Sequence, residues 1–255
     1  MMDMFDLKGK VAVVIGGAGG IGVGLVKGLS QYGAKVVVAS RNQEAIEKVA
    51  AAVEKETGND TFSHTVDVTS EDSMGKLKDA VVEKFGTCDI LVNAMGLNLK
   101  RLVIEFPVDE WDTMFDINVK GTMIACKVFG NVMKENRSGK IINLSSVREI
   151  RSMPGGDAGY AATKAAVGMY TKTLALEMAE YNVNVNAIGP ALIITPGTIH
   201  VIEDPVIAKK MKDMIPLGRL GYPEDLVGAC IFLSSKASDF VSGQTYFLDG
   251  GLTVK

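Results

Sequence analysis

The sequence predicts an α/β fold, a single doubly wound parallel sheet with helices on both faces. Two observations favour it. Short apolar runs alternate with longer helical patterns along the whole chain, which is typical of parallel strands joined by crossover helices. The chain has 255 residues, and no linker, repeat or low-complexity tract divides it. A chain of this length can form one large domain or two small ones, and we expect one domain over residues 1–255.

Composition and charge restrict the classes of function. Hydrophobic residues make up 47% of the chain and charged residues 22%, which is ordinary for a soluble globular protein. The net charge of −3 argues against nucleic acid as a main partner, because phosphate binding requires a basic face. The segment Met1–Lys10 lacks the apolar run of a signal peptide, and no stretch of about 18 unbroken apolar residues predicts a membrane span. We expect a cytoplasmic protein without a nucleic-acid or membrane partner.

The cysteines and histidines indicate neither disulfide nor metal chemistry. Cys88, Cys126 and Cys230 are odd in number and far apart, and no Cys-x-x-Cys occurs. We expect reduced, buried thiols. His64 and His200 have neither ligand spacing nor thiol neighbours in the sequence, so we expect no metal site.

The first strand and the glycines after it predict an anion site. Val11–Ile15 is a continuous apolar run, which suits a strand buried on both faces. The sequence GGAGGIG follows, and a helical pattern then runs to Gly33. Backbone N–H groups of such a turn and the helix N-terminus can face a pyrophosphate, although glycines also serve as bare turns. The glycines concerned are Gly16, Gly20 and Gly22.

The end of the second strand bears on cofactor choice. Lys35–Ala39 is the strand, and Ser40 and Arg41 follow it. A site that prefers NAD usually carries an acid here for the ribose 2′-hydroxyl, and this chain has none. Arg41 could hold a 2′-phosphate with help from the Ser40 hydroxyl, or it could simply be solvated. We expect NADP, with NAD possible.

The third strand ends in an acid with two possible roles. Gln43–Thr57 is an alanine-rich helix that Gly58 stops, and Thr61–Val66 is the third strand. Asp67 follows it and could accept a hydrogen bond from an adenine amine. It could also cap the helix that starts near Ser70, and both roles can hold together.

The fourth strand leads to a long helix with a polar residue inside it. Asp89–Val92 is the strand, and it enters the run Asn93–Gly96. We expect a long helix within Val108–Asn136, with Asn118 in an apolar stretch. A buried amide must find hydrogen-bond partners, so Asn118 either makes a structural bond or belongs to a polar site.

The fifth strand and the helix after it bring three reactive groups together. Lys140–Leu144 is the strand, and Ser146 follows at its carboxyl end, where open α/β sheets place ligands. A helix is expected from Ala158 to about Tyr181. Tyr160 and Lys164 are four residues apart and share one face of it. Such a pair is also common on exposed helices, so its weight comes from the other motifs.

The last third of the chain completes the sheet. Asn182–Ile188 is the sixth strand, with Gly189 and Pro190 at its end. Residues 191–217 hold three prolines and are expected to form a substrate loop with short helices. We expect a helix from Pro223 to about Ser234 and a last strand at Gln244–Leu248.

These motifs, in this order and at this spacing, resemble the short-chain dehydrogenase/reductase family over essentially the whole chain. Within the family, the chain looks most like sugar-acid dehydrogenases of the gluconate 5-dehydrogenase type, although 3-oxoacyl-carrier-protein reductases share the motifs. Many NADP-using members have a basic residue in the glycine turn where this chain has Gly19. The matching residues are Gly16, Gly20, Gly22, Asp67, Asn93–Gly96, Asn118, Ser146, Tyr160, Lys164, Gly189, Pro190 and Asp249–Gly251.

The resemblance implies a Rossmann-like fold and hydride transfer between nicotinamide and a secondary alcohol or ketone. Tyr160 would be the general acid/base, Ser146 would orient the substrate oxygen, and Asn118 would hold a relay water. Lys164 would bind the nicotinamide ribose, and its charge would favour the phenolate of Tyr160, whose free pKa is about 10. A homotetramer is implied through the helices that begin near Val108 and Ala158. The expected cofactor contacts are Gly16, Gly20, Ile21, Gly22, Ser40, Arg41, Asp67, Val68, Asn93, Gly96, Tyr160, Lys164, Pro190, Ile193 and Thr195.

Basic and amide side chains near the crevice suggest a substrate. Asn98 and Arg101, with Lys100, follow the fourth strand, and Arg148 follows the fifth. Arg148 would bind a carboxylate bidentately, which suits a sugar acid or related polyol. The other interpretation is that these groups point to solvent or pair with nearby glutamates.

Two further functions stay open. A 3-oxoacyl-carrier-protein reductase would also favour a basic entrance, for a phosphopantetheine arm. A catalytically silent NADP-binding scaffold is the alternative that is not an enzyme, because a fold does not by itself imply a function.

Overall fold

The sheet has seven parallel strands in the order β3-β2-β1-β4-β5-β6-β7, and the predicted fold class is confirmed. The computed structural model describes residues 4–255, so part of the segment for which no signal peptide was predicted, Met1 to Asp3, lies outside it. The strands are β1 (Val11–Ile15), β2 (Lys35–Ser40), β3 (Thr61–Thr65), β4 (Ile90–Asn93), β5 (Gly139–Leu144), β6 (Val183–Pro190) and β7 (Thr245–Leu248).

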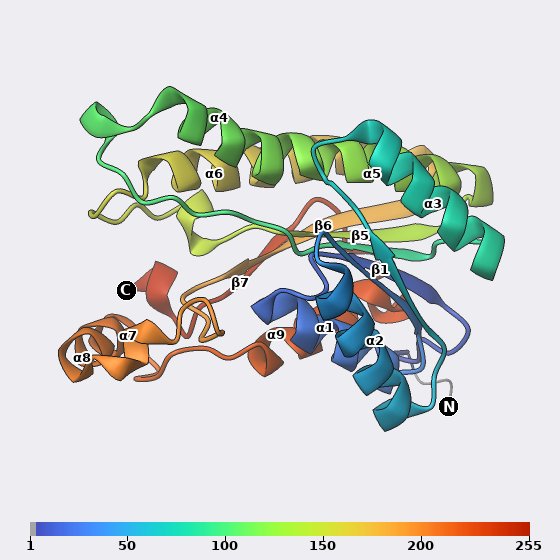
Figure 1. Ribbon diagram of the computed structural model, residues 1–255, viewed down its shortest axis with the longest axis horizontal. Helices are drawn as coiled ribbons and strands as arrows, with labels where there is room; N and C mark the ends of the chain where they lie inside the picture. Colours follow the sequence, from blue (N-terminus) through green and yellow to red (C-terminus); the bar gives the residue numbers. More distant parts are fainter. Residues whose placement is uncertain (1–3) are drawn as a thin grey trace.

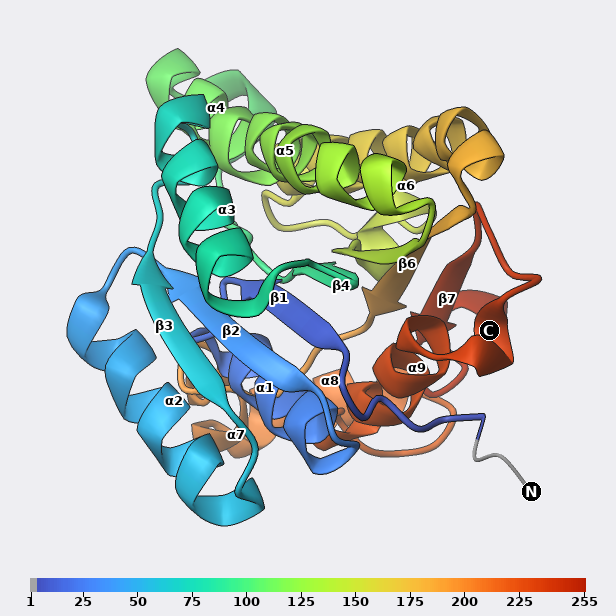
Figure 2. The ribbon, with the colours of Figure 1, turned by 90° about the vertical axis from the view of Figure 1, so that its right-hand side faces the viewer.

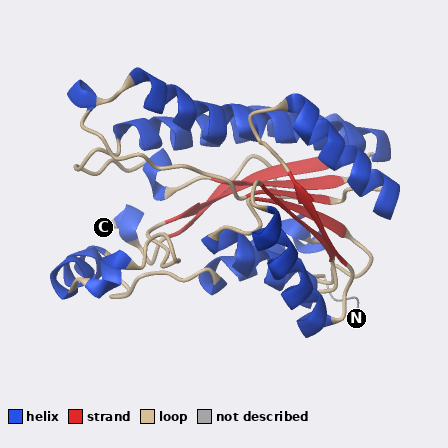
Figure 3. Ribbon diagram, in the orientation of Figure 1, coloured by secondary structure: helices blue, strands red, loops and turns tan. Residues whose placement is uncertain are grey.

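Helices cover both faces of the sheet (Figures 1 and 2). One layer contains α3 (Glu71–Phe85), α4 (Val108–Phe115), α5 (Gly121–Asn136) and α6 (Ala158–Met178). The other contains α1 (Gly20–Gln31), α2 (Gln43–Thr57) and α9 (Glu224–Ser234). Figure 3 shows the strands as a single layer between these two groups of helices.

The continuous apolar runs are explained by burial on both faces. Successive residues of a strand point to opposite faces, and in β1 they enter two different cores. Val11, Val13 and Ile15 pack with residues of α3, α5 and α6. Ala12 and Val14 pack with residues of α1, α2 and α9. Each face of the strand is therefore covered, so no polar alternation is needed.

Residues 191–217, which we call the lid segment, contain α7 (His200–Glu203) and α8 (Pro205–Met214). In Figure 1 they project beyond the sheet, with the C-terminus beside them. A small apolar cluster that includes Ile194, Val201, Ile215 and Leu220 holds the segment together. The expected loop with short helices is thus observed.

Two local expectations are corrected. Asp67 does not cap α3, because the side chain of Ser70 accepts the hydrogen bond from Ser73 N–H at 3.2 Å. The helix expected within Val108–Asn136 is not uniform. A π-helical turn, Asp116–Lys120, separates α4 from α5. Such turns often occur at functional sites, and this one contains Asn118.

The remaining expectations concern cysteines, metals and membranes. Cys88, Cys126 and Cys230 are all buried and free of disulfides, as predicted. Among residues 4–255, no group of three His, Cys, Asp or Glu side chains could hold a metal ion. Within the same range, no helix is both long and apolar enough to span a bilayer.

Candidate active site

A cleft of about 600 Å³ lies at the carboxyl ends of β1, β4, β5 and β6, with the lid segment on one side. This is where the strand order reverses direction around β1, the position at which open α/β sheets bind ligands. The predicted site residues that line the cleft are Gly20, Ile21, Gly96, Asn98, Ser146, Arg148, Tyr160, Lys164, Pro190, Ile193 and Thr195.

The hydroxyl of Ser146 lies beside the phenol of Tyr160. Ser146 is 7% exposed; its Oγ accepts from Arg148 N–H at 3.2 Å and lies 3.5 Å from Pro190 O. Burial raises the pKa of the Tyr160 phenol to about 12, and the negative charge of Asp157 acts in the same direction. A hydrogen bond with Ser146 and the charge of Arg148 oppose this rise. Strand β5 and helix α6 therefore deliver two hydroxyl groups to one point.

The ammonium of Lys164 lies in the floor of the cleft. Lys164 is 3% exposed, and its Nζ donates to Leu144 O at 2.7 Å and lies 5.6 Å from the centre of the Tyr160 ring. Burial lowers the pKa of Lys164 to about 8. The groups that lower the pKa of the phenol in this geometry are Ser146 and Arg148.

The Asn118 side chain is used by the protein itself. Its Oδ1 accepts from Leu97 N–H at 2.7 Å, and its Nδ2 donates to Leu97 O at 2.8 Å and to Thr163 Oγ1 at 3.0 Å. The amide thus pairs with the loop after β4 as a neighbouring strand would. The main-chain carbonyl of Asn118 accepts from the Thr122 hydroxyl at 2.8 Å. Asn118 therefore fixes the loop that carries Gly96 against α6.

Three of the other expected cofactor residues lie behind the cleft surface. A Cβ at Gly22 would lie 2.1 Å from Gly16 O, and one at Gly16 (φ 81°) would lie 2.8 Å from the backbone of Ala94. Both positions therefore require glycine for the turn to close. The Asn93 side chain points into the core and donates to Asn143 Oδ1 at 2.8 Å. Its amide supports the sheet and does not reach the cleft.

The ends of β2 and β3 form a separate, exposed group. Asp67 Oδ1 accepts from Thr69 N–H and Thr69 Oγ1, which keeps the pKa of Asp67 below its usual value. The positive charge of Arg41 acts in the same direction. Arg41 is exposed and, within residues 4–255, makes no hydrogen bond or ion pair. Ser40 ends β2 next to Arg41, and Val68 is buried beside Gly121.

Arg148 reaches the cleft but is already engaged. Its Nε donates to Asp157 Oδ2 at 3.1 Å, and its two terminal nitrogens contact Arg151 O at 3.3 Å and Met153 Sδ at 2.9 Å. The bidentate carboxylate contact predicted for Arg148 would therefore have to compete with these bonds within the protein. Pairing with glutamate is wrong for Arg148, since its partner is an aspartate.

The residues after β4 divide between the cleft and the surface. Asn98 and Lys100 line the cleft. Arg101 does not: its guanidinium binds the Glu110 carboxylate at 3.0 Å. Arg101 thus pairs with a glutamate, which is the alternative interpretation given for these basic residues.

Sequence reasoning missed two carboxylates near Ser146. Asp157 lines the cleft at the start of α6 and could have been noticed as an acid preceding a helix. Glu149 Oε2 accepts from Ser145 Oγ at 2.7 Å, and its Oε1 accepts from Thr245 Oγ1 at 3.2 Å. Glu149 therefore ties the Ser145–Ser146 segment to β7, a contact with no sequence signal.

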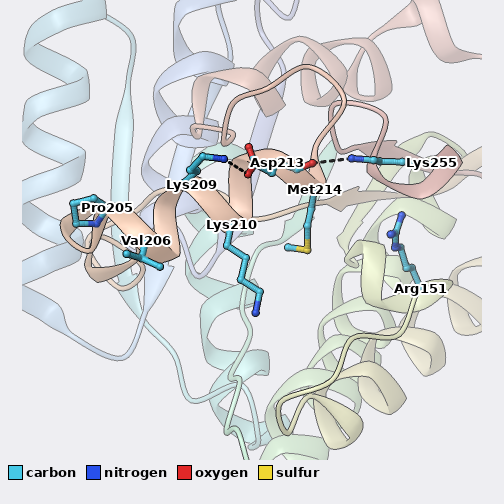
Figure 4. A pocket seen from close by; sticks show the side chains of 8 residues that line it. All are labelled: Arg151, Pro205, Val206, Lys209, Lys210, Asp213, Met214 and Lys255. Carbon is cyan, nitrogen blue, oxygen red and sulfur yellow. Dashed lines mark hydrogen bonds and ion pairs between the residues drawn. The ribbon is translucent and has the colours of Figure 1, made fainter.

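A second hollow, of about 640 Å³, lies on the outer side of α8 (Figure 4). Figure 4 shows Lys210 and Met214 pointing into it, with Arg151 across from them. Lys209 binds Asp213 at 2.6 Å, and Lys255 Nζ donates to Asp213 O at 2.7 Å. None of Ser146, Tyr160 and Lys164 lines this hollow, so the reactive groups identify the first cleft as the candidate active site.

A family model and several known proteins resemble this chain. The model described as enoyl-(acyl carrier protein) reductase matches residues 16–253. Gluconate 5-dehydrogenase of Gluconobacter oxydans is 36% identical over 252 residues, which are 99% of this chain and 98% of that protein. The 5-keto-D-gluconate 5-reductase of Escherichia coli is 35% identical over 258 residues, 100% of this chain and 99% of that protein.

Other specificities match almost as well. A 3-oxoacyl-[acyl-carrier-protein] reductase of Thermotoga maritima is 35% identical over 248 residues, 97% of this chain and 99% of that protein. Among solved structures, a gluconate 5-dehydrogenase from Burkholderia cenocepacia in complex with NADP and tartrate superimposes with a TM-score of 0.95. It is 34% identical, and the match covers 99% of this chain and 98% of that one.

Proposed function

Because the chain belongs to the short-chain dehydrogenase/reductase family and is an NAD(P)-dependent oxidoreductase, we propose that it interconverts a secondary alcohol and a ketone of a sugar acid. The proposed substrate pair is of the gluconate/5-ketogluconate type, and the proposed cofactor is NADP(H). The observation that carries the proposal is the convergence of the Ser146 hydroxyl, the Tyr160 phenol and the Lys164 ammonium on one cleft beside the glycine turn.

The glycine turn fits a dinucleotide. Gly19 and Gly20 line the cleft without side chains, and α1 begins at Gly20 with no side chain capping its first N–H groups. Those donors can therefore receive a pyrophosphate. The lid segment closes this part of the cleft, because Thr195 packs tightly against Gly20. A Cβ added at Gly20 would lie 2.3 Å from Thr195 Cβ. A bound nicotinamide supplies or accepts the hydride.

The protein's own contribution is to hold the substrate oxygen and move its proton. In our proposal, Ser146 donates a hydrogen bond to the substrate oxygen, and Tyr160 gives or takes the proton at its phenol oxygen. The pKa of Lys164, lowered to about 8 by burial, leaves it able to exchange a proton near neutral pH, whereas a free lysine with a pKa of about 10.4 would not.

Asn118 has a positioning role in this proposal. Its side chain is engaged with Leu97 and Thr163, so a relay water would bind at its main-chain carbonyl, which faces Thr122. The side chain would keep Gly96 beside Lys164. A Cβ at Gly96 would lie 3.5 Å from Lys164 Nζ, which shows how closely the loop approaches the ammonium.

The cofactor preference is supported at the end of β2. We propose that Arg41 and Ser40 bind the 2′-phosphate of NADP and that Asp67 and Val68 contact the adenine. Arg41 is exposed and unpaired among the described residues, so its guanidinium is available for a phosphate. The Burkholderia cenocepacia structure with NADP is consistent with this preference.

The substrate class rests on the relatives and on the cleft. The gluconate enzymes of Gluconobacter oxydans and Escherichia coli cover nearly the whole chain, and Lys100 and Asn98 give the cleft a polar wall. Because the Thermotoga maritima 3-oxoacyl-[acyl-carrier-protein] reductase is also similar to this chain, an acyl thioester is the second candidate substrate. Steady-state assays with 5-keto-D-gluconate, gluconate, neutral polyols and a 3-oxoacyl thioester, each with both cofactors, decide between them.

The assembly and location are further proposals. Exposed apolar side chains on the outer layer support a homotetramer built through α4, α5 and α6: Val108 is 73% exposed, Met169 62% and Leu176 81%. Light scattering after size exclusion tests the tetramer, and cell fractionation tests a cytoplasmic location. Limited proteolysis tests the single domain over residues 1–255, with first cuts expected in the lid segment.

A further inference from the structure

One carboxylate at the Tyr160 end of the cleft is unused by the chemistry above. Asp157 immediately precedes α6, three residues before Tyr160, and it lines the cleft. It is 6% exposed, and its Oδ2 accepts from Arg148 Nε. Its Oδ1 is buried and has no hydrogen-bond partner among residues 4–255. Buried polar atoms are nearly always paired, so this oxygen points to a missing donor.

A cation faces the same oxygen at an unusual distance. Lys100 Nζ lies 3.9 Å from Asp157 Oδ1, which is too far for a hydrogen bond. An oxygen atom about 2.8 Å from each of them would complete a triangle of two hydrogen bonds. The Lys100 side chain is 64% exposed, so it is able to move outward and admit such an atom. A hydroxyl group suits the position because it both donates and accepts.

We infer that Asp157 and Lys100 form a subsite for one hydroxyl group of the substrate, which donates to Asp157 Oδ1 and accepts from Lys100 Nζ. This rests on the proposed function and narrows it, because the substrate then carries a hydroxyl in addition to the group that reacts. The ligand is a polyhydroxy ketone or alcohol.

Other ligand groups fit this position poorly. A carboxylate would face the negative charge of Asp157 at hydrogen-bond distance, and an ammonium would face Lys100 and Arg148. An acyl chain would leave Oδ1 unpaired, which is costly for a buried charged group. The carboxylate of a sugar acid therefore lies elsewhere in the cleft.

Arg148 is a positioning residue for this subsite. Its contacts with Asp157 Oδ2, Arg151 O and Met153 Sδ fix the carboxylate so that Oδ1 is presented toward Lys100. Arg148 thus acts through Asp157 in this subsite, and the groups that contact the substrate hydroxyl are Asp157 and Lys100.

The test compares 5-keto-D-gluconate with its monodeoxy analogues, each lacking one hydroxyl. The ratio kcat/KM is measured with NADPH for the wild type, Asp157→Asn and Lys100→Met, and Lys48→Met on the exposed side of α2 is the control. Asp157→Asn keeps an oxygen for Arg148 Nε, and Lys100 is exposed, so one of the two variants folds even if the other does not.

The wild type and the control should lose about 10- to 150-fold in kcat/KM on one particular analogue, as expected for a hydrogen bond to a charged group. Each variant should have a lower kcat/KM than the wild type on the parent ketone. For each variant, the kcat/KM on that same analogue should be within about twofold of its kcat/KM on the parent ketone. The subsite is refuted, while the proposed function stands, in two cases. In one, the variants lower kcat/KM by the same factor on every substrate. In the other, the wild type has the same kcat/KM on the parent ketone and on every monodeoxy analogue. If the wild type reduces only simple ketones or acyl thioesters, both fail together.

Discussion

Lys164 Nζ donates to the Leu144 carbonyl at 2.7 Å and faces the Tyr160 ring at 5.6 Å from its centre. The two residues lie one turn apart on α6. Burial shifts the pKa of each in the direction that favours its uncharged form. The pKa of Lys164 falls to about 8 and that of Tyr160 rises to about 12. Both shifts have consequences for stability that can be measured.

The stability of the protein should rise between about pH 8 and pH 10. In this range the unfolded chain keeps a proton on Lys164, whose unfolded pKa is about 10.4, whereas the folded protein releases it, so increasing pH favours folding. For Lys164 alone we expect a gain of about 2 kcal/mol between pH 7.5 and pH 9.5. The opposite shift of Tyr160 reverses the trend above about pH 10, the pKa of a free phenol.

Urea unfolding of the wild type and of Lys164→Met at both pH values isolates this contribution. The variant has no ammonium to desolvate, so the gain should disappear in it. An equal pH dependence in both proteins would contradict the proposed burial of a titrating Lys164.

Arg41→Ala should weaken NADPH binding much more than NADH binding. A hydrogen bond between charged groups contributes about 1.5–3 kcal/mol, which is about 10- to 150-fold in Kd. Fluorescence titration with both cofactors measures the difference, and Lys48→Ala is a matched control on an exposed helix face. Equal losses for NADPH and NADH would mean that Arg41 does not read the 2′-phosphate.

Asn118→Ala should both destabilise the protein and slow turnover. Leu97 N–H and Leu97 O lose their partner in a site where Asn118 is 1% exposed, and each unsatisfied buried group costs about 1–3 kcal/mol. The control is Asn136→Ala, whose exposed amide contacts Thr87 Oγ1. Thermal unfolding and kcat are measured for both variants. If Asn118→Ala is as stable and as active as Asn136→Ala, the hydrogen bonds between Asn118 and Leu97 are unimportant.

Gly168→Ala should perturb the active site from a distance. A Cβ at Gly168 would lie 2.2 Å from Glu149 Cδ, so Glu149 must move and release Ser145 and Thr245. Because the neighbouring Ser146 then loses its support, we expect kcat to fall by about tenfold, which is less than the roughly 10²- to 10⁴-fold contributed by a general acid/base itself. Gly228→Ala on α9, where a Cβ meets nothing within 4 Å, should be silent. Equal activities of the two variants would refute the link.

Much of the fold could be predicted because local signals and burial agree. The five residues of β1 are apolar throughout, since both faces of the strand are covered, and Gly58 stops α2 at the predicted residue in a left-handed conformation. The Ser146, Tyr160 and Lys164 set could also be predicted, because helix spacing and a strand end fix it.

The remaining features depend on contacts between distant residues. The π-helical turn contains no proline or glycine, and its Asn118 is held by Leu97, 21 positions away in the chain. Arg148 finds Asp157 only because the intervening loop turns back, with Gly155 and Gly156 both at positive φ. No periodicity encodes either contact, so the sequence does not indicate that Arg148 is paired with Asp157.

The most direct test of the account is the rate of NADPH-dependent reduction of 5-keto-D-gluconate by Tyr160→Phe. The substitution removes the phenol proton and keeps the ring, so kcat should fall by about 10²- to 10⁴-fold, with the Kd for NADPH, measured by fluorescence, nearly unchanged. If Tyr160→Phe instead keeps more than about a tenth of the wild-type rate, Tyr160 is not the group that transfers the proton, since a general acid/base contributes far more than that.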